Sequence, residues 1–378
     1  MFISRSLPLF EGIRMQADHA DDLASIRDQA QRLLLDLTTP EHLKSLLNEP
    51  GSFDGTLWDH AVEQGWTTVA VPERFGGLGL GWGGLAVLSE ELGQVTGSLP
   101  LMANTLAIYV LIAAGAAEYD AHLQGLVEGS RIACLALATP EESGLSGNSA
   151  VRESQGRLSG YSAATPFASI ADVALVRAGQ YLYLVPLDQK GIERRIGDTF
   201  DNARATAVLR FDEVQAQRLG NASLVAELGS LAALITAFEQ IGGTQACLNM
   251  ACDYARERRA FGQVIGSFQG IKHKLAEIYC LLEIARGCAS DALDAWEQNL
   301  PDRQPLTCAA RIAATRAYDL AAQENLHVHG GMGVTWEAMP HHHYRRSRSL
   351  ALELGGLPYW REWLLAELGI ESATELAG

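Results

Sequence analysis

The chain has 378 residues, of which 48% are hydrophobic and 20% are charged, and its formal net charge is −16. These values are those of a folded protein with a sizeable core, and the negative charge argues against general binding to nucleic acid or to an anionic membrane. The six cysteines include no CxxC pair, which gives little support to a zinc or redox motif and fits reduced thiols in the cytoplasm. No apolar run approaches the roughly 20 residues of a membrane span, and the start lacks the features of a secretory signal.

The N-terminal third is rich in helix signals. Apolar residues recur at helical spacing from Asp21, and further helices are predicted over LWDHAVEQGW, LAVLSEELGQ and LMANTLAIYVLIAAGAA. The last of these stretches is about 17 residues long and bounded by polar sequence, so we expect a buried core helix there. Residues 1–128 are assigned to an N-terminal helical domain.

The pattern changes near Arg131. Between residues 129 and 217 the apolar runs are short, several alternate with polar residues, and Gly, Asp and Pro separate them. Such runs are typical of strands in a sandwich or a barrel. We therefore expect a middle β-domain over this range.

Helical periodicity returns near Ala222 and persists to the end of the chain. Three long amphipathic segments and a shorter one, WREWLLAELG, predict a four-helix bundle over residues 218–378. Because helices, strands and helices follow one another in blocks, the fold class is predicted to be α+β and not an alternating βαβ fold.

Three segments carry a resemblance to one known family. They are GWTTVAVPERFGGLGLGWGGLAVLSEELG at residues 65–93, RRAFGQVIGSFQGIKHKLAEI at residues 258–278 and HVHGGMGVTWEAMPHHHYRRSRSLALELGG at residues 327–356. In order and approximate spacing they resemble the acyl-CoA dehydrogenase family. The resemblance covers nearly the whole chain and implies an acyl-CoA dehydrogenase-like fold, FAD as cofactor, α,β-dehydrogenation of an acyl-CoA thioester and electron transfer to an electron-transfer flavoprotein.

The resemblance also implies which residues reach the cofactor. An arginine fork suits a pyrophosphate, and consecutive glycines let the backbone approach a ligand closely. Without the resemblance, the arginines are equally explained as a solvated helix end, and the glycines as a plain turn that ends a helix. Residues expected to reach the FAD of a neighbouring subunit, which makes an oligomer part of the site, are Arg258, Phe261, Gln269, Gly330, Gly331 and Gly333. His327 stands where the family commonly has a glutamine and joins this cofactor-binding set.

The β-domain of the family contacts the flavin ring. The stretch ATPEESGLSGN resembles the family's Thr-Glu-Pro segment, and Thr139 is expected to hydrogen-bond the ring. Later in this domain the family usually has a Trp-x-Thr triplet. This chain has Ala164, Thr165 and Pro166 followed by Phe167, so the tryptophan is absent. The proline and the aromatic residue resemble a subgroup that acts on bulky acyl-CoA substrates.

The family's catalytic base is a glutamate whose pKa is raised by an apolar pocket. Its usual place corresponds to Leu354 here, and its second known place corresponds to Ala232. Glu239 lies seven residues after Ala232, about two helical turns further on nearly the same face, so it is the first candidate. Glu353, one residue from the usual place, is the second. The alternatives are an interhelical ion pair for Glu239 and a solvated charge for Glu353.

A run of adjacent histidines, His341, His342 and His343, resembles a metal cluster at first sight. Adjacent residues point in different directions on a helix or a strand, so they rarely share one ion, and we expect no metal.

Three functions are compatible with these features. The first is an FAD-dependent acyl-CoA dehydrogenase for a bulky or steroid-derived substrate, working as a homo-oligomer or a hetero-oligomer. The second is a non-catalytic or half-site partner subunit of a heteromeric acyl-CoA dehydrogenase, which the absent glutamates at Leu354 and Ala232 motivate. The third is a flavin monooxygenase on the same fold.

Overall fold

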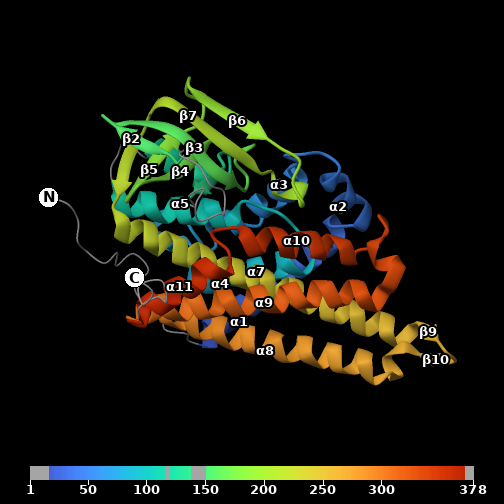
Figure 1. Cartoon of the computed structure of the whole chain (residues 1–378). Helices are drawn as coiled ribbons and strands as arrows, with labels where there is room; N and C mark the ends of the chain where they lie inside the picture. Colours follow the sequence, from blue (N-terminus) through green and yellow to red (C-terminus); the bar gives the residue numbers. More distant parts are fainter. Residues whose placement is uncertain (1–16, 116–119, 138–149, 371–378) are drawn as a thin grey trace, which may run out of the picture.

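The computed structural model describes residues 17–115, 120–137 and 150–370, and the chain folds into helical, β and helical parts in that order (Figure 1). The first part contains α1 (Ala17–Leu37), α2 (Pro40–Leu47), α3 (Gly55–Glu63), α4 (Gly81–Gln94), α5 (Leu101–Ala114) and α6 (Asp120–Val127). Helix α5 is buried along nearly its whole length, as the sequence predicted for a core helix.

The middle part consists of two four-stranded sheets. The strands are β1 (Ala133–Ala136), β2 (Arg152–Ser154), β3 (Arg157–Thr165), β4 (Val173–Ala178), β5 (Tyr181–Pro186), β6 (Ile192–Ile196), β7 (Ala207–Gln215) and β8 (Gln217–Gly220). One sheet has the order β1-β4-β5-β8 and the other β2-β3-β7-β6. Only the β1–β4 pair is parallel among these named strands. A separate apolar core, which includes Val176, Leu209 and Phe211, fills the space between the sheets.

The C-terminal part is built from long helices. These are α7 (Ala222–Glu257), α8 (Gln269–Glu297), α9 (Arg303–His329), α10 (Pro340–Leu352) and α11 (Leu357–Glu367), and a short hairpin of β9 (Arg259–Ala260) and β10 (Gln263–Val264) joins α7 to α8. In Figure 1, α7, α8 and α9 run side by side, the two sheets lie at one end of α7, and the β9–β10 hairpin lies at the other end. This hairpin end is called the free end of the bundle below.

Helix α7 is the central helix of the molecule, because it packs against α4, α8 and α9. Among the described residues it is also the one helix whose length and composition would allow it to cross a membrane, although much of it is buried inside the protein. Glycines let α4 cross α7 closely. A Cβ atom added at Gly93 would lie 2.0 Å from the carbonyl oxygen of Glu239, and one at Gly242 would lie 1.9 Å from that of Glu90. This crossing places Glu239 beside the turn between α4 and α5.

Candidate active site

Both candidate bases, Glu239 and Glu353, bind the same arginine. Arg204 lies on a short 3-10 turn, Asn202–Arg204, which precedes β7. Its Nη1 donates to both carboxylate oxygens of Glu239, at 3.0 and 3.2 Å, while its Nε and Nη2 donate to the two oxygens of Glu353 at 2.8 and 2.5 Å. Although burial opposes its charge, the two carboxylates raise the pKa of Arg204. The guanidinium therefore stays charged between two glutamates.

A second arginine, Arg346 on α10, binds the other side of Glu239. Its Nη1 donates to a Glu239 carboxylate oxygen at 2.9 Å, and its Nε donates to the Asp201 carboxylate at 2.5 Å. Its remaining donors bind the backbone carbonyls of Thr96 and Gly97, at 2.9 and 2.8 Å. These contacts join α10, the middle part and the α4–α5 turn at one buried point.

We call Asp201, Arg204, Glu239, Arg346 and Glu353 the charge cluster. Both arginines are nearly inaccessible, with side-chain exposures of 4% for Arg204 and 2% for Arg346. Burial raises the pKa of Glu353, and the adjacent Arg204 opposes that rise. Glu239 accepts three arginine N–H bonds and Glu353 accepts two, so neither carboxylate can move toward a substrate proton without breaking a buried ion pair.

Arg311 holds the backbone next to Glu353. It is fully buried, and its Nη2 donates to the carbonyl oxygens of Leu350 and Glu353, the latter at 2.9 Å. Burial lowers the pKa of Arg311 to about 10, a value that keeps it charged at neutral pH. A cation that binds the last carbonyls of α10 compensates the helix dipole. The next residue, Leu354, has φ +61°, so the family's usual base position lies on a left-handed turn fixed by Arg311.

The space beside Glu239 is small. A cavity of about 30 Å³ lies between the α4–α5 turn, α5 and α7, which is room for about one water molecule. Apart from Arg204 and Glu239 its lining carries no charge, and it consists of Ser89, Leu92, Gly97, Leu99, Leu101, Met102, Ala103, Phe167, Ile235 and Thr236. The guanidinium of Arg204 lies 5.4 Å from the centre of the Phe167 ring and closes the cavity on the side of the β-domain.

The backbone around this closure is strained. Phe167 and Ala205 have φ values of +61° and +47°, which side chains other than glycine rarely adopt. The N–H of Phe167 donates to the carbonyl of Arg204 at 2.9 Å, and the N–H of Ser169 donates to that of Ala205 at 3.1 Å. Two hydrogen bonds therefore fix the turn that carries Arg204.

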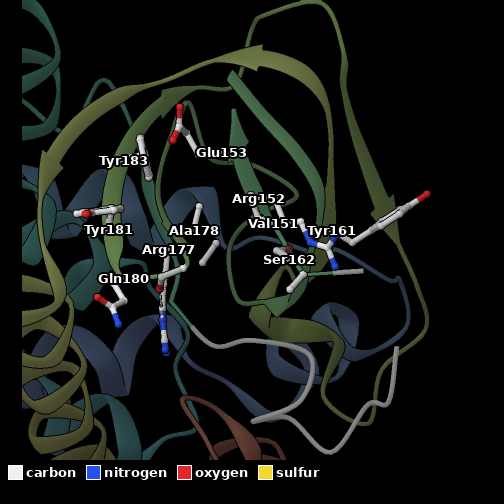
Figure 2. Close-up of a pocket in the computed structure, with 13 residues that line it drawn as sticks. Val151, Arg152, Glu153, Tyr161, Ser162, Arg177, Ala178, Gln180, Tyr181 and Tyr183 are labelled. Atoms are coloured by element: carbon white, nitrogen blue, oxygen red, sulfur yellow. Dashed lines mark hydrogen bonds between the residues drawn. The ribbon is translucent and has the colours of Figure 1, made fainter. Parts of the chain in front are cut away.

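Two larger hollows lie on either side of the turn between β4 and β5. The first, about 610 Å³, lies between the two sheets, and Figure 2 shows Arg152 and Ser162 on one side of it and Arg177 and Gln180 on the other, with the Tyr161 ring pointing away from them. The second, about 360 Å³, lies between the same turn, the start of α7 and the tryptophans of α11. Leu354 lines this second hollow and not the small cavity, so the family's base position and Glu239 face different spaces.

The predicted cofactor residues of the C-terminal part gather at the free end of the bundle. Arg258 caps α7 and is exposed, as is Gln269 at the start of α8, and Phe261 is 96% exposed. A stack of Tyr254 on His329, with ring centres 4.3 Å apart, joins the ends of α7 and α9. The two motifs that are distant in sequence are thus adjacent in space, and they lie away from the charge cluster.

The glycine turn at this end is open. Gly330 has φ +61°, and a Cβ atom added at Gly330 or Gly331 would meet nothing within 4 Å, whereas Gly333 is buried and packed. His327 is exposed, and its Nδ1 lies 3.2 Å from a carboxylate oxygen of Glu324, which also binds Lys274. Neither Arg258 nor Arg259 pairs with a carboxylate in the described part of the chain. The end combines free guanidinium groups, an exposed aromatic ring and accessible backbone.

Two predicted features of the β-domain give no further site. Thr139 lies outside the described residues. Thr165, the middle residue of the stretch that stands in place of the family's Trp-x-Thr triplet, is buried and donates its hydroxyl to the carbonyl of Ala163 at 2.9 Å. Its hydroxyl hydrogen is already used inside the protein.

The histidine run is part of the packing around α10. His341 stacks between Trp336 and His342, and His343 shares a 3.0 Å hydrogen bond with the hydroxyl of Tyr318. Burial lowers the pKa of His342 to about 4 and that of His343 to about 3. Over the residues that the structure describes, no group of three or more potential ligands is arranged to hold a metal ion.

Known proteins resemble the chain over most of its length. Residues 20–130 match the model of the acyl-CoA dehydrogenase N-terminal domain, and residues 230–356 match that of the C-terminal domain. Acyl-CoA dehydrogenase IpdE2 of Mycobacterium tuberculosis is 29% identical over 331 residues, which are 86% of this chain and 91% of that protein.

Solved structures give the same result. The Tcur3481–Tcur3483 steroid ACAD is 28% identical, with a TM-score of 0.85 over 95% of this chain and 100% of that chain. The ChsE4–ChsE5 complex from Mycobacterium tuberculosis is 25% identical, with a TM-score of 0.85 over 95% of this chain and 99% of that chain.

The fold and the two domain matches define a flavoprotein of the oxidoreductase class that acts on acyl-CoA thioesters. The chain belongs to the acyl-CoA dehydrogenase family. The predicted family, the α+β fold with its three parts and the family's FAD-dependent oxidoreductase class are thereby confirmed. The sequence did not reveal Arg204 and Asp201, because nothing in the stretch DNARATA distinguishes them from surface residues of a loop.

Proposed function

We propose that this chain is a subunit of a heteromeric, FAD-dependent acyl-CoA dehydrogenase. In this role it contributes the free end of its bundle to the flavin site of a related partner subunit and supplies no catalytic base of its own. The observation that carries the proposal is the double engagement of Arg204, which binds both Glu239 and Glu353 and leaves about 30 Å³ of space beside them. An acyl chain and a free carboxylate do not fit that arrangement.

The residues at the free end suit a flavin nucleotide. Free arginines match the charge and geometry of a pyrophosphate, the Phe261 ring offers a stacking surface, and the open turn at Gly330 and Gly331 admits a close backbone approach. When bound, FAD supplies the hydride acceptor of the reaction. Because Arg258 and Phe261 point into solvent at the end of the bundle furthest from the sheets, the flavin they reach belongs to a partner subunit.

The names of similar proteins support the heteromeric assembly and the substrate class. One similar structure is described as a steroid ACAD and another as a complex of two chains. We infer a bulky, steroid-derived acyl-CoA as the substrate of the assembled enzyme, an electron-transfer flavoprotein as the electron acceptor and the cytoplasm as the compartment. The base that removes the α-proton then stands on the partner subunit.

The test is to purify this chain alone and together with a related dehydrogenase subunit. We expect the single chain to lack the yellow flavin absorption and the assembled pair to be yellow and bleached by its acyl-CoA. In the pair, Arg258→Ala lowers the flavin content. Glu239→Gln leaves turnover within about twofold, because Glu239 is not the base; this is well below the tenfold loss that a change of about 1.4 kcal/mol in the barrier would cause. Arg256→Ala, which removes an exposed arginine paired with Asp253, is the matched control.

Two outcomes overturn the proposal. One is a yellow single chain that an acyl-CoA bleaches. The other is a loss of turnover on the order of a hundredfold or more in Glu239→Gln, which is the range for removing a general base.

A further inference from the structure

We propose that Arg204 is the plug of an otherwise intact acyl cavity, and that this one side chain determines that the chain binds no aliphatic ligand. The inference rests on the proposed function and goes beyond it, because it assigns the loss of the ligand site to one residue and not to a rebuilt core. The chemical class that the unplugged cavity takes is a short, unbranched, uncharged aliphatic carbonyl compound.

The lining of the cavity shows that the apolar site is still present. Leu99, Leu101, Met102 and Ile235 surround the space from three elements. Met102 accepts a long contact of 3.7 Å from the hydroxyl of Thr236, whose main hydrogen bond goes to its own helix at Ala232. A core that had been rebuilt to remove the site would have filled it with larger apolar side chains, and here the filling group is the guanidinium of Arg204.

Arg204 enters from outside this lining. It comes from the β-domain, on a turn with two left-handed residues, and crosses to the carboxylates of α7 and of the segment after α10. Strained backbone of this kind persists only where surrounding contacts hold it. Here the contacts that hold it are those that keep Arg204 in the cavity, since Phe167 donates its N–H to the Arg204 carbonyl and packs its ring against the guanidinium.

Removing Arg204 alone would leave a buried negative charge, because Glu353 has its carboxylate bonds only from Arg204 in the described residues. A charge-balanced variant avoids this problem. In Arg204→Ala with Glu353→Gln, the remaining cluster keeps Arg346 with Asp201 and Glu239. The control is Arg204→Met with Glu353→Gln, which makes the same change in charge but keeps a side chain of similar length in the cavity.

The probe is butyramide, an uncharged amide with a four-carbon chain whose NH₂ group can donate to Glu239. We expect a saturable, concentration-dependent rise in Tm for the alanine variant, and electron density for the amide between Met102 and Glu239 in its crystals. The wild-type chain and the methionine control show neither. If the alanine variant does not fold, Arg204→Val with Glu353→Gln and the shorter probe propionamide provide the same test.

A folded alanine or valine variant that binds no amide overturns the inference, as does binding by the methionine control. This result is separate from the proposed function, because ligand binding is measured without cofactor, partner or turnover. If the single chain turns over an acyl-CoA and the folded cavity variant binds no amide, both proposals are refuted. If the single chain is inactive and the folded cavity variant binds no amide, only the role of Arg204 as the plug is refuted.

Discussion

The charge cluster and the free end of the bundle are built in opposite ways. The cluster is buried, its arginines are fully paired, and its members come from positions as distant as Asp201 and Glu353. The free end is exposed, Arg258 and Arg259 have no carboxylate partner in the described residues, and its residues lie in two short motifs. The charge cluster has its polar groups paired within the chain and therefore has few donors or acceptors for a ligand. Within the described residues, the free end has unpaired donors and an exposed ring, which a bound partner can pair and cover.

The largest expected effect comes from breaking the cluster at Arg346. Arg346→Ala leaves Asp201 and one side of Glu239 without a cation and frees the carbonyls of Thr96 and Gly97. Removing one partner of a buried ion pair costs about 3–5 kcal/mol of unfolding free energy. Urea denaturation of the single chain measures this loss.

The control for that experiment is Arg256→Ala, since Arg256 forms an exposed pair with Asp253 at 2.7 Å. An exposed pair of this kind contributes about 1 kcal/mol or less. Equal losses in the two variants would show that burial does not distinguish the cluster from the surface.

The two regions also differ in how far the sequence predicts them. The residues of the free end lie within contiguous motifs, RRAFG and HGGMG, so their type and spacing could be recognised directly. Helical counting also placed Glu239 on the inner face of α7, because the period of 3.6 residues persists over that segment.

Counting along a helix did not reveal what Glu239 meets. Its partners Arg204 and Arg346 lie 35 and 107 residues away in the chain, one on the turn before β7 and the other on α10. Such a pairing depends on the packing of three separate parts. The local sequence pattern therefore could not predict this pairing, and an ion pair for Glu239 was only the alternative interpretation.

An intermediate effect is expected from pH, through the histidines packed beside the cluster. Burial, His341, Arg345 and Arg346 lower the pKa of His342 to about 4, and Asp201 opposes them. Because the folded-state pKa lies below the ordinary value of about 6.5, the unfolded chain binds more protons between these two values. The unfolding free energy therefore falls as pH decreases from about 6.5 to 4, by up to about 1.4 kcal/mol per pH unit for one such histidine.

Urea denaturation at several pH values in that window measures the slope. His342→Gln should make it shallower, whereas His60→Gln, which changes a half-exposed histidine of α3, should leave it unchanged. A slope that does not respond to His342 would assign the acid sensitivity to other groups.

The smallest effect on stability is expected at Phe261, and it separates the two regions most clearly. The ring is 96% exposed on a residue with φ +52°, so it contributes almost no burial to this chain. Phe261→Ala should change the unfolding free energy of the single chain by no more than about 0.5 kcal/mol. In the assembled pair the same change removes an aromatic contact of about 0.5–1.5 kcal/mol, which corresponds to a weakening of flavin binding by up to roughly tenfold.

Leu352→Ala is the matched control, because Leu352 is also apolar and 68% exposed but lies at the end of α10 and not at the free end. Titration of the flavin-free pair with FAD, followed by flavin fluorescence, compares the two variants. If they bind FAD equally well, Phe261 is an ordinary exposed side chain and the flavin contact belongs to other residues. If only Phe261→Ala weakens binding while both single chains keep their stability, then a residue that does nothing for its own fold is placed there for a partner.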